Sequence, residues 1–279
     1  MSVDITLLGT GSPMVDPNRA GPATLVQAGG EHYLVDCGRG VLMRLAAAGV
    51  PANQLAALCI THLHSDHITD LNDVITSMLI TTFEPTPFRI IGPPGTRATV
   101  GHIVASLGPD IGYRIAHHDD LSEGPLLEVV ESDGVGTPDV SVGSVRVTTA
   151  PTDHRPVEPS IAFRFDHDGV GVVAAGDTVP CAGLDELSAG AQAIVHTVIR
   201  KDIIAEIPIP RLLDTLDYHS SPEEAAQTAE RAGMNTLVLT HYVPAIPSGG
   251  GDDWRELAAQ HFSGRIELGD DLHQITITN

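Results

Sequence analysis

A short cluster of metal-binding side chains constrains this chain more than any other feature. Three histidines and one aspartate stand within the six positions from His62 to His67. The apolar run 57–60 before the cluster is typical of a buried strand, and 70–79 has the pattern of a helix. The cluster therefore follows a strand end, where α/β folds bind their ligands.

The side-chain types in this cluster favour a catalytic site over a structural one. An isolated histidine is usually a surface or core residue, but solvation does not explain this density. Imidazole and carboxylate are the ligands of open catalytic zinc sites, and the thiolates of closed structural sites are absent here. A loop at a strand end can point His62 and His64 one way and Asp66 and His67 the other. We therefore expect two adjacent metal pockets.

Composition limits the class of protein. The chain has 279 residues, 42% of them hydrophobic, and no break in composition marks a linker, so we expect one domain over residues 1–279. The net charge of −21 disfavours autonomous binding to polyanions. No apolar run approaches the roughly 18 residues of a membrane span, and the N-terminus lacks the pattern of a signal peptide. Three cysteines without paired spacing indicate reduced thiols and a cytoplasmic location.

Strands and helices alternate along the chain. We expect helices over 39–48, 70–79, 96–107, 184–189, 222–232 and 252–261. We expect strands over 3–8, 23–27, 32–35, 57–60, 88–91, 113–117, 126–131, 140–142, 145–149, 160–165, 170–174, 193–198, 236–239 and 274–277. The two halves share a layout of hairpins followed by βα units with polar residues at strand ends. This layout predicts an α/β fold, a four-layer αββα sandwich.

Four further polar residues, Asp36, His154, Asp177 and His241, stand at predicted strand ends. Asp36 has two possible roles: accepting a proton from a metal-binding imidazole, or capping the following helix. Taken alone, a residue of the other three would more often form hydrogen bonds with backbone groups than bind a metal ion. Together with the first cluster, they supply two half-sites and a bridge.

These ordered motifs resemble the metallo-β-lactamase superfamily over essentially the whole chain. The resemblance begins with Thr61-His62-x-His64-x-Asp66-His67 and continues through the strand-end residues. It implies one metal ion held by His62, His64 and His154, a second held by Asp66, His67 and His241, and Asp177 as the bridge. The implied cofactors are two Zn²⁺ ions, although Mn²⁺ and iron tolerate the same ligands.

Within the superfamily the chain is most similar to the ribonuclease Z and arylsulfatase-like branch. The opening 7–13 and the motif Tyr218-His219-Ser220-Ser221 carry this resemblance. Two departures stand out. The family motif His-Glu-Ala-Thr appears as His196-Thr197-Val198-Ile199, without the glutamate that orients the catalytic histidine. Only 22 residues separate His154 from Asp177, too few for the basic arm by which bacterial members grip tRNA.

The resemblance implies a dinuclear metal-dependent hydrolase that cleaves phosphodiesters, of the tRNA 3′-processing endonuclease type, by a metal-bridging hydroxide. Asp66 would coordinate and accept the water proton. His219 would protonate the leaving group or stabilise the transition state, unless it is only a neighbour of a helix N-cap. The alternative is a hydrolase of small esters (aryl sulfate, cyclic nucleotide, phosphotriester or lactone), which the missing arm and the acidic charge favour. A non-catalytic metal-binding scaffold fits the complete ligand set poorly.

The expected partners follow from the same resemblance: a phosphodiester substrate such as precursor tRNA, a second copy in a homodimer, and no membrane. The insert 200–218 carries Arg200, Lys201 and Arg211, three of the 15 basic residues, together with several isoleucines. It fits a lid over the substrate, a dimer contact or an RNA contact, and the sequence leaves these three open.

Overall fold

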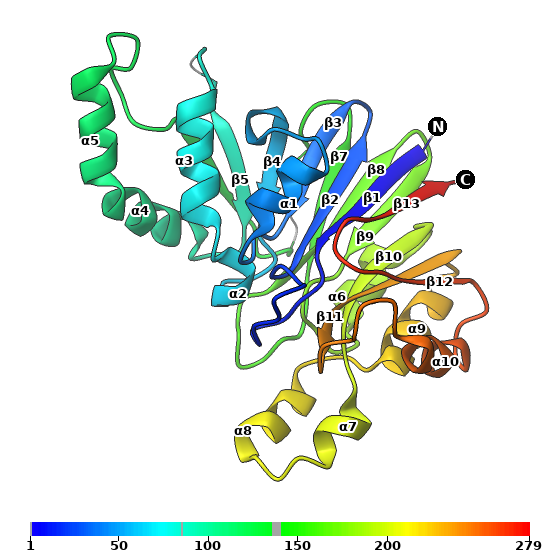
Figure 1. Cartoon of the computed structure of the whole chain (residues 1–279). Coiled ribbons are helices and arrows are strands. Elements are labelled where there is room, and N and C mark those ends of the chain that lie inside the picture. Colours follow the sequence, from blue (N-terminus) through cyan, green and yellow to red (C-terminus); the bar gives the residue numbers. More distant parts are fainter. Residues whose placement is uncertain (1, 85, 136–140) are drawn as a thin grey trace.

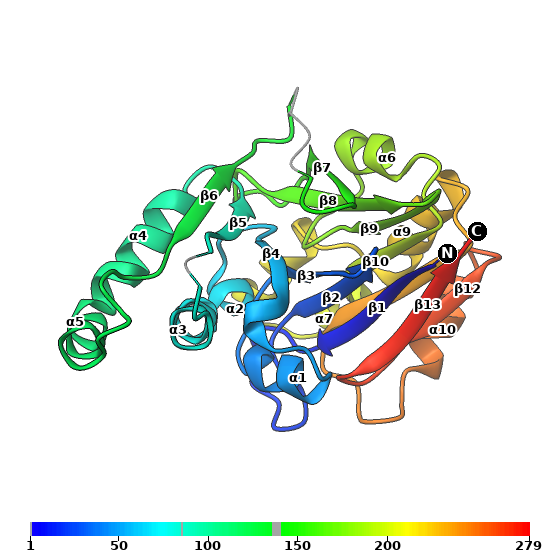
Figure 2. The same ribbon diagram turned by 90° about the horizontal axis from the view of Figure 1, so that it is seen from above.

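Two β-sheets pack face to face, with helices on their outer surfaces (Figures 1 and 2). The structure is a computed structural model that describes residues 2–84, 86–135 and 141–279. The predicted four-layer αββα sandwich is confirmed. The chain ends lie together on adjacent strands, because the first and last strands of the described chain pair with each other.

The first sheet has the order β13-β1-β2-β3-β4-β5-β6. Its strands are β1 (Ser2–Gly9), β2 (Ala23–Ala28), β3 (Glu31–Val35), β4 (Leu55–Cys59), β5 (Phe88–Gly92), β6 (Leu127–Glu131) and β13 (His273–Thr278). The strands from β3 to β6 run parallel, and β13, β1, β2 and β3 pair antiparallel. Parallel pairing brings the carboxyl ends of β3, β4 and β5 to one edge.

The second sheet has the order β12-β11-β10-β9-β8-β7. Its strands are β7 (Arg146–Pro151), β8 (Ile161–His167), β9 (Val170–Ala174), β10 (Ala193–Ile199), β11 (Thr236–Val243) and β12 (Arg265–Leu268). The strands from β9 to β12 are parallel, and β7, β8 and β9 form an antiparallel meander.

Helices cover the outer face of each sheet. The helices of the described residues are α1 (Val41–Ala47), η1 (Ala52–Gln54), α2 (Ser65–Ile68), α3 (Leu71–Thr81), α4 (Thr96–Ser106), α5 (Gly108–His117), α6 (Ala182–Ser188), α7 (Lys201–Ala205), α8 (Pro210–Leu213), η2 (Asp214–Asp217), α9 (Pro222–Arg231) and α10 (Asp252–Ala259). Helices α1, α3 and α4 pack on the first sheet, and α6, α9 and α10 on the second. Within the described residues, no helix is long and apolar enough to cross a membrane.

The core between the sheets explains the apolar runs in the sequence. In β1, Ile5 and Leu7 point into the space between the sheets, whereas Leu8 packs under the outer helices. Strands buried on both faces read as continuous apolar runs rather than as alternating ones. Across the inner layer, the rings of Tyr33 and Phe165 lie 5.2 Å apart, which joins the two sheets.

Some predicted elements were wrong or missing. The segment 113–117, predicted as a strand, is the end of α5, which Pro109 begins and an ion pair of 2.8 Å from Arg114 to Asp110 supports. Five residues of mixed polarity are too few to distinguish a strand from a helix by periodicity, and the i,i+4 ion pair favours the helix. Of the predicted strand 140–142, residue 140 lies outside the described residues, and Val142 forms only a bridge with Val145. The elements α7, α8 and β12 were not predicted.

We expect Phe163→Ala to lower the free energy of unfolding by about 3–5 kcal/mol, because the ring is fully buried between the sheets and leaves a cavity. Urea unfolding followed by circular dichroism measures the loss. Phe83→Ala is the matched control, since that ring is 84% exposed. A loss below about 1 kcal/mol for Phe163→Ala would contradict the packing described.

Candidate metal centre

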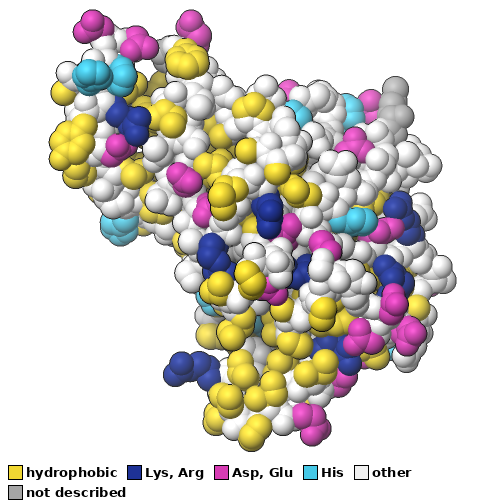
Figure 3. Space-filling model, in the orientation of Figure 1, with side chains coloured by type: hydrophobic (Ala, Val, Ile, Leu, Met, Phe, Trp, Pro, Cys, Tyr) yellow, Lys and Arg dark blue, Asp and Glu magenta, His cyan; other side chains and the backbone are white. Residues whose placement is uncertain are grey.

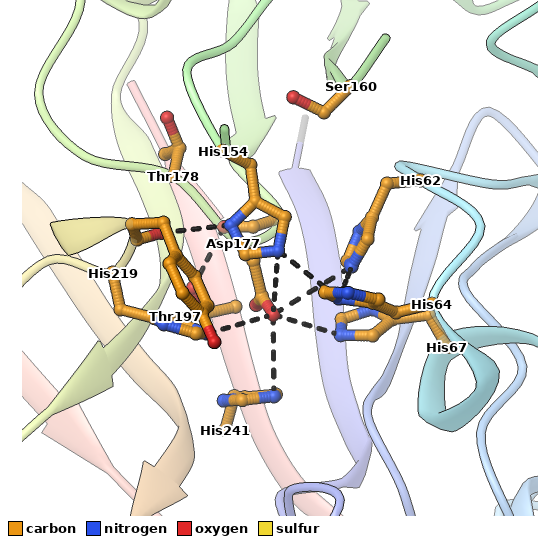
Figure 4. Close-up of polar contacts among 12 residues, drawn as sticks. His62, His64, His67, His154, Ser160, Asp177, Thr178, Thr197, His219 and His241 are labelled. Carbon is orange, nitrogen blue, oxygen red and sulfur yellow. Dashed lines mark hydrogen bonds and ion pairs between the residues drawn. The ribbon is translucent and has the colours of Figure 1, made fainter. Parts of the chain in front are cut away.

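Five segments distant in sequence bring their polar residues to one rim of the sandwich (Figure 4). Three of them follow β4, β7 and β9, one precedes α9, and one is the last part of β11. The converging side chains are His62, His64, Asp66, His67, His154, Asp177, His219 and His241. All are buried except His64, which is partly exposed.

The first group of ligand atoms comes from His62, His64 and His154. The Nδ1 atom of His64 lies 3.1 Å from Nε2 of His62 and 3.2 Å from Nε2 of His154. Tetrahedral ligands about 2.0–2.1 Å from a zinc ion lie roughly 3.3 Å from one another. The three nitrogens therefore have the spacing of ligands around one ion.

The second group comes from Asp66, His67 and His241. The Oδ2 atom of Asp66 lies 3.6 Å from Nε2 of His67 and 3.4 Å from Nε2 of His241. The arrangement resembles the first group but exchanges one imidazole for a carboxylate. A mixed set of nitrogen and oxygen ligands suits a catalytic ion that also binds substrate.

Asp177 lies between the two groups. Its Oδ2 atom is 3.9 Å from Nε2 of His62 and of His154 on one side. On the other side it is 3.3 Å from Nε2 of His67 and 3.5 Å from Nε2 of His241. One carboxylate thus faces both groups, as a bridging ligand does.

Gly176 allows this approach. It has φ +66°, and a Cβ atom there would meet Cβ of Thr61 at 2.7 Å. A side chain at this position would push the bridge away from the β4 loop, so the residue before Asp177 must be glycine.

Asp36 holds the first cluster in place. Its Oδ1 atom accepts a hydrogen bond from the Thr61 backbone amide (2.8 Å), and its Oδ2 atom accepts from Nδ1–H of His67 (2.8 Å). This fixes the His67 tautomer whose Nε2 lone pair faces the site. Helix α1 has Gly40 at its N-cap, so Asp36 is not the cap, and the first of its two sequence-based roles applies.

Backbone carbonyls orient two other histidines. The carbonyl of Tyr218 accepts from Nδ1–H of His154 (2.8 Å), and that of Thr215 accepts from Nδ1–H of His219 (3.1 Å). The Nε2 atom of His219 then lies 3.3 Å from Oδ2 of Asp177. Every residue has a backbone carbonyl, so no residue type in the sequence marks these two contacts.

The glycine-rich turn after β1 supports the last histidine. His241 has φ +56°, a left-handed conformation that is strained for a side-chain-bearing residue. The next amide, of Tyr242, donates to the carbonyl of Thr10 (3.1 Å). The turn therefore serves the site through its backbone.

Electrostatics divides the histidines into two sets. Burial holds the pKa of His62 well below its usual value and lowers that of His154 to about 4, so both are neutral ligands at pH 7. Burial also opposes charge on His67, but the carboxylates of Asp177 and Asp36 outweigh it and raise the pKa of His67 well above its usual value. The second half of the site thus attracts positive charge.

The buried polar atoms fit a metal ion. The Oδ1 atom of Asp177 and the Nε2 atom of His67 are buried without a hydrogen-bond partner among the described residues. Unpaired buried groups of this kind are costly unless a cation binds them. Burial alone would raise the pKa of Asp177, yet the imidazoles of His241 and His67 hold it well below the usual value, so the bridge is ionised.

Comparisons with known proteins show the family to which this chain belongs. The family model described as anti-Pycsar protein Apyc1 matches residues 3–244. A protein of Mycolicibacterium paratuberculosis named ribonuclease Z is 60% identical over 99% of this chain and 98% of its own length. The Mycobacterium marinum protein of the same name is 59% identical, over 99% of each chain. The chain belongs to the family of that model and to the ribonuclease Z family.

Solved structures show the same fold. The metallo-β-lactamase fold protein YhfI from Bacillus subtilis has a TM-score of 0.76 at 22% identity, over 99% of this chain and 100% of its own. The short form of human tRNase Z has a TM-score of 0.70 at 23% identity, with the same coverage. This chain, a homologue of proteins named ribonuclease Z, is therefore a metal-dependent hydrolase with the metallo-β-lactamase fold. The alternative of a small-ester hydrolase is not favoured.

We expect Asp36→Asn to weaken metal binding about 10-fold to 100-fold, because the Thr61 amide keeps the asparagine carbonyl and the NH₂ group then faces Nδ1 of His67. The proton must move to Nε2, where it blocks the ligand lone pair. Chelator competition measures the affinity, with Asp73→Asn on the exposed face of α3 as control. Unchanged affinity in a folded Asp36→Asn protein would contradict this role.

Proposed function

We propose that this chain is a tRNA 3′-processing endonuclease that cuts precursor tRNA beyond its acceptor end. The observation that carries the proposal is the convergence of the seven candidate ligands in a chain about 60% identical to proteins named ribonuclease Z. The named relatives match along nearly their whole length, which supports one hydrolase domain over residues 1–279.

We propose two divalent ions, zinc by the chemistry of the donors, at this centre. His62, His64 and His154 would hold one and Asp66, His67 and His241 the other, with Asp177 shared. When bound, two such ions would lower the pKa of a metal-bound water towards ~7 and neutralise charge on the phosphate. Buried neutral imidazoles and the ionised bridge give the ions fixed ligands.

The protein side chains supply proton transfer. Asp66 faces the site with a pKa below its usual value: burial would raise it, but hydrogen bonding to His241 prevails. It is therefore ionised and able to accept the proton of the attacking water. His219 faces the centre through Nε2, where it can donate a proton to the leaving 3′-oxygen.

Two threonines replace the missing family glutamate. Thr197 stands at its position in the motif, and the Thr197 hydroxyl donates a hydrogen bond to the carbonyl of Gly176 (2.9 Å), the residue before the proposed bridge Asp177. The carbonyl of Thr215 holds Nδ1–H of His219 instead of a carboxylate. A neutral acceptor fixes the same tautomer without adding negative charge near the phosphodiester.

We also propose a cytoplasmic homodimer. Hydrophobic side chains gather on the surface formed by α7 and α8 (Figure 3). Ile203 is 37% and Ile209 50% exposed there, and such patches mark contact surfaces. Cys37 and Cys59 are buried free thiols, which agrees with a reducing compartment.

We expect the metal-loaded protein to cleave precursor tRNA and His64→Ala to abolish cleavage and lower the bound metal, since one ligand nitrogen is removed from the first group. Gel assays and elemental analysis measure the two effects. His102→Ala, on the exposed face of α4, is the control. Failure on tRNA with efficient turnover of aryl sulfates, lactones or bis-p-nitrophenyl phosphate would overturn the proposed substrate.

We expect His219→Ala to keep its metal but to lower kcat on precursor tRNA roughly 10²-fold to 10⁴-fold, the usual range for loss of a general acid. The loss should be smaller on bis-p-nitrophenyl phosphate, because p-nitrophenolate leaves without a proton. An equal loss on both substrates would contradict leaving-group protonation. Loss of metal would instead identify His219 as a ligand.

A further inference from the structure

A cavity of about 400 Å³ adjoins the metal centre. His64, the one partly exposed histidine of the first group, lines it from the metal side. Tyr218 lines it from the loop before α9, and Arg155 and Arg211 line it further out. A substrate bound at the metal ions therefore has room to extend along this cavity.

The two arginines of the cavity differ in whether nearby carboxylates already pair with their guanidinium groups. Arg155 donates from Nη2 to Asp153 at 2.6 Å and from Nε at 2.9 Å, and Glu158 lies 3.8 Å away. The guanidinium of Arg211, exposed on α8, has no hydrogen bond or ion pair with any residue that the structure describes. In a chain of net charge −21, an unpaired guanidinium beside the catalytic centre is an available anion site.

The remaining lining limits what this site accepts. Asp214 and Asp217 also line the cavity, and their carboxylates repel anions with several charges. A single phosphodiester or phosphate at the guanidinium is the anion that the balance allows. The site would thus bind one phosphate, whereas an extended basic arm would contact many phosphates of the tRNA.

The ring of Tyr218, the residue directly before His219, also lines the cavity. The ring of Tyr218 packs edge-on against His154, with centroids 5.2 Å apart, and is partly exposed in the cavity. Aromatic rings stack on nucleobases of any sequence. A nucleoside seated on Tyr218 would carry one phosphate at the metals and present the other outward.

We propose that Arg211 binds the phosphate next to the scissile one, so that the cavity accommodates a nucleoside phosphorylated on both its 5′ and 3′ oxygens. This rests on the proposed phosphodiesterase function and adds a substrate requirement to it. Arg211 in α8 precedes Thr215 by four residues, and the carbonyl of Thr215 in η2 orients His219, so the proposed phosphate anchor and the proposed general acid are carried by one short segment.

The test uses two pairs of p-nitrophenyl substrates. One pair is thymidine 5′-(p-nitrophenyl phosphate) with and without a 3′-phosphate, and the other is the 3′-ester with and without a 5′-phosphate. The wild type should prefer the doubly phosphorylated member of one pair. Arg211→Gln should raise KM for that member roughly 10-fold to 100-fold and leave the singly phosphorylated esters within about twofold. Arg211→Lys should retain part of the preference.

Two further arginines sharpen the test. Arg146→Gln, at the far end of β7 from the His154 loop, is the control that changes an exposed arginine outside the cavity. Arg155→Gln should cost less than Arg211→Gln, because Asp153 already occupies its guanidinium. No preference in either pair, an equal loss on both members, or a larger loss for Arg155→Gln would overturn the proposal.

A binding readout separates this proposal from the substrate assignment. Calorimetry should show thymidine 3′,5′-bisphosphate binding to the metal-loaded wild type more tightly than either monophosphate, and Arg211→Gln should remove that difference. If the difference is present and precursor tRNA is not cleaved, the anchor holds and the tRNA assignment fails. If tRNA is cleaved and no difference exists, the anchor fails alone.

Discussion

The buried carboxylate of Asp177 is the constraint on which this site depends. Its Oδ2 atom lies within 3.9 Å of five imidazole nitrogens, which come from the loops after β4 and β7, the loop before α9, helix α2 and strand β11. An anion so deeply buried is stable only if positive charge surrounds it. That charge comes either from protonated histidines or from metal ions, and His62 and His154 resist protonation. The two sheets therefore meet around a place that selects cations.

The fold makes this convergence possible. Parallel strands in both sheets bring their carboxyl ends to the same rim, so residues more than 170 positions apart become neighbours, as Asp66 and His241 do at 3.4 Å. The tightly packed inner layer fixes one sheet against the other. Only a rigid scaffold holds ligand atoms within the few tenths of an ångström that metal coordination requires.

The sequence predicted the parts of this structure that side-chain type and periodicity specify. Polar residues after apolar runs identified His154, Asp177 and His241, and the two-faced burial of strands such as β4 left clear apolar runs. It could not predict the hydrogen bond to the carbonyl of Thr215, since every residue has a carbonyl, or the helix at 113–117, whose five residues of mixed polarity have no decisive period. Arg211 also needed the structure, because a free guanidinium is identified only by the absence of partners in space.

An acidic protein can bind a polyanionic substrate if the attractive charges lie close to the bound phosphate. A field of −21 charges opposes RNA at long range, but screening limits that repulsion to about 8 Å at physiological ionic strength. Within that distance of a bound phosphodiester, the metal ions and the guanidinium of Arg211 determine the potential. An enzyme built this way would gain little from general electrostatic steering and would instead recognise its substrate by a few contacts at the cleavage site.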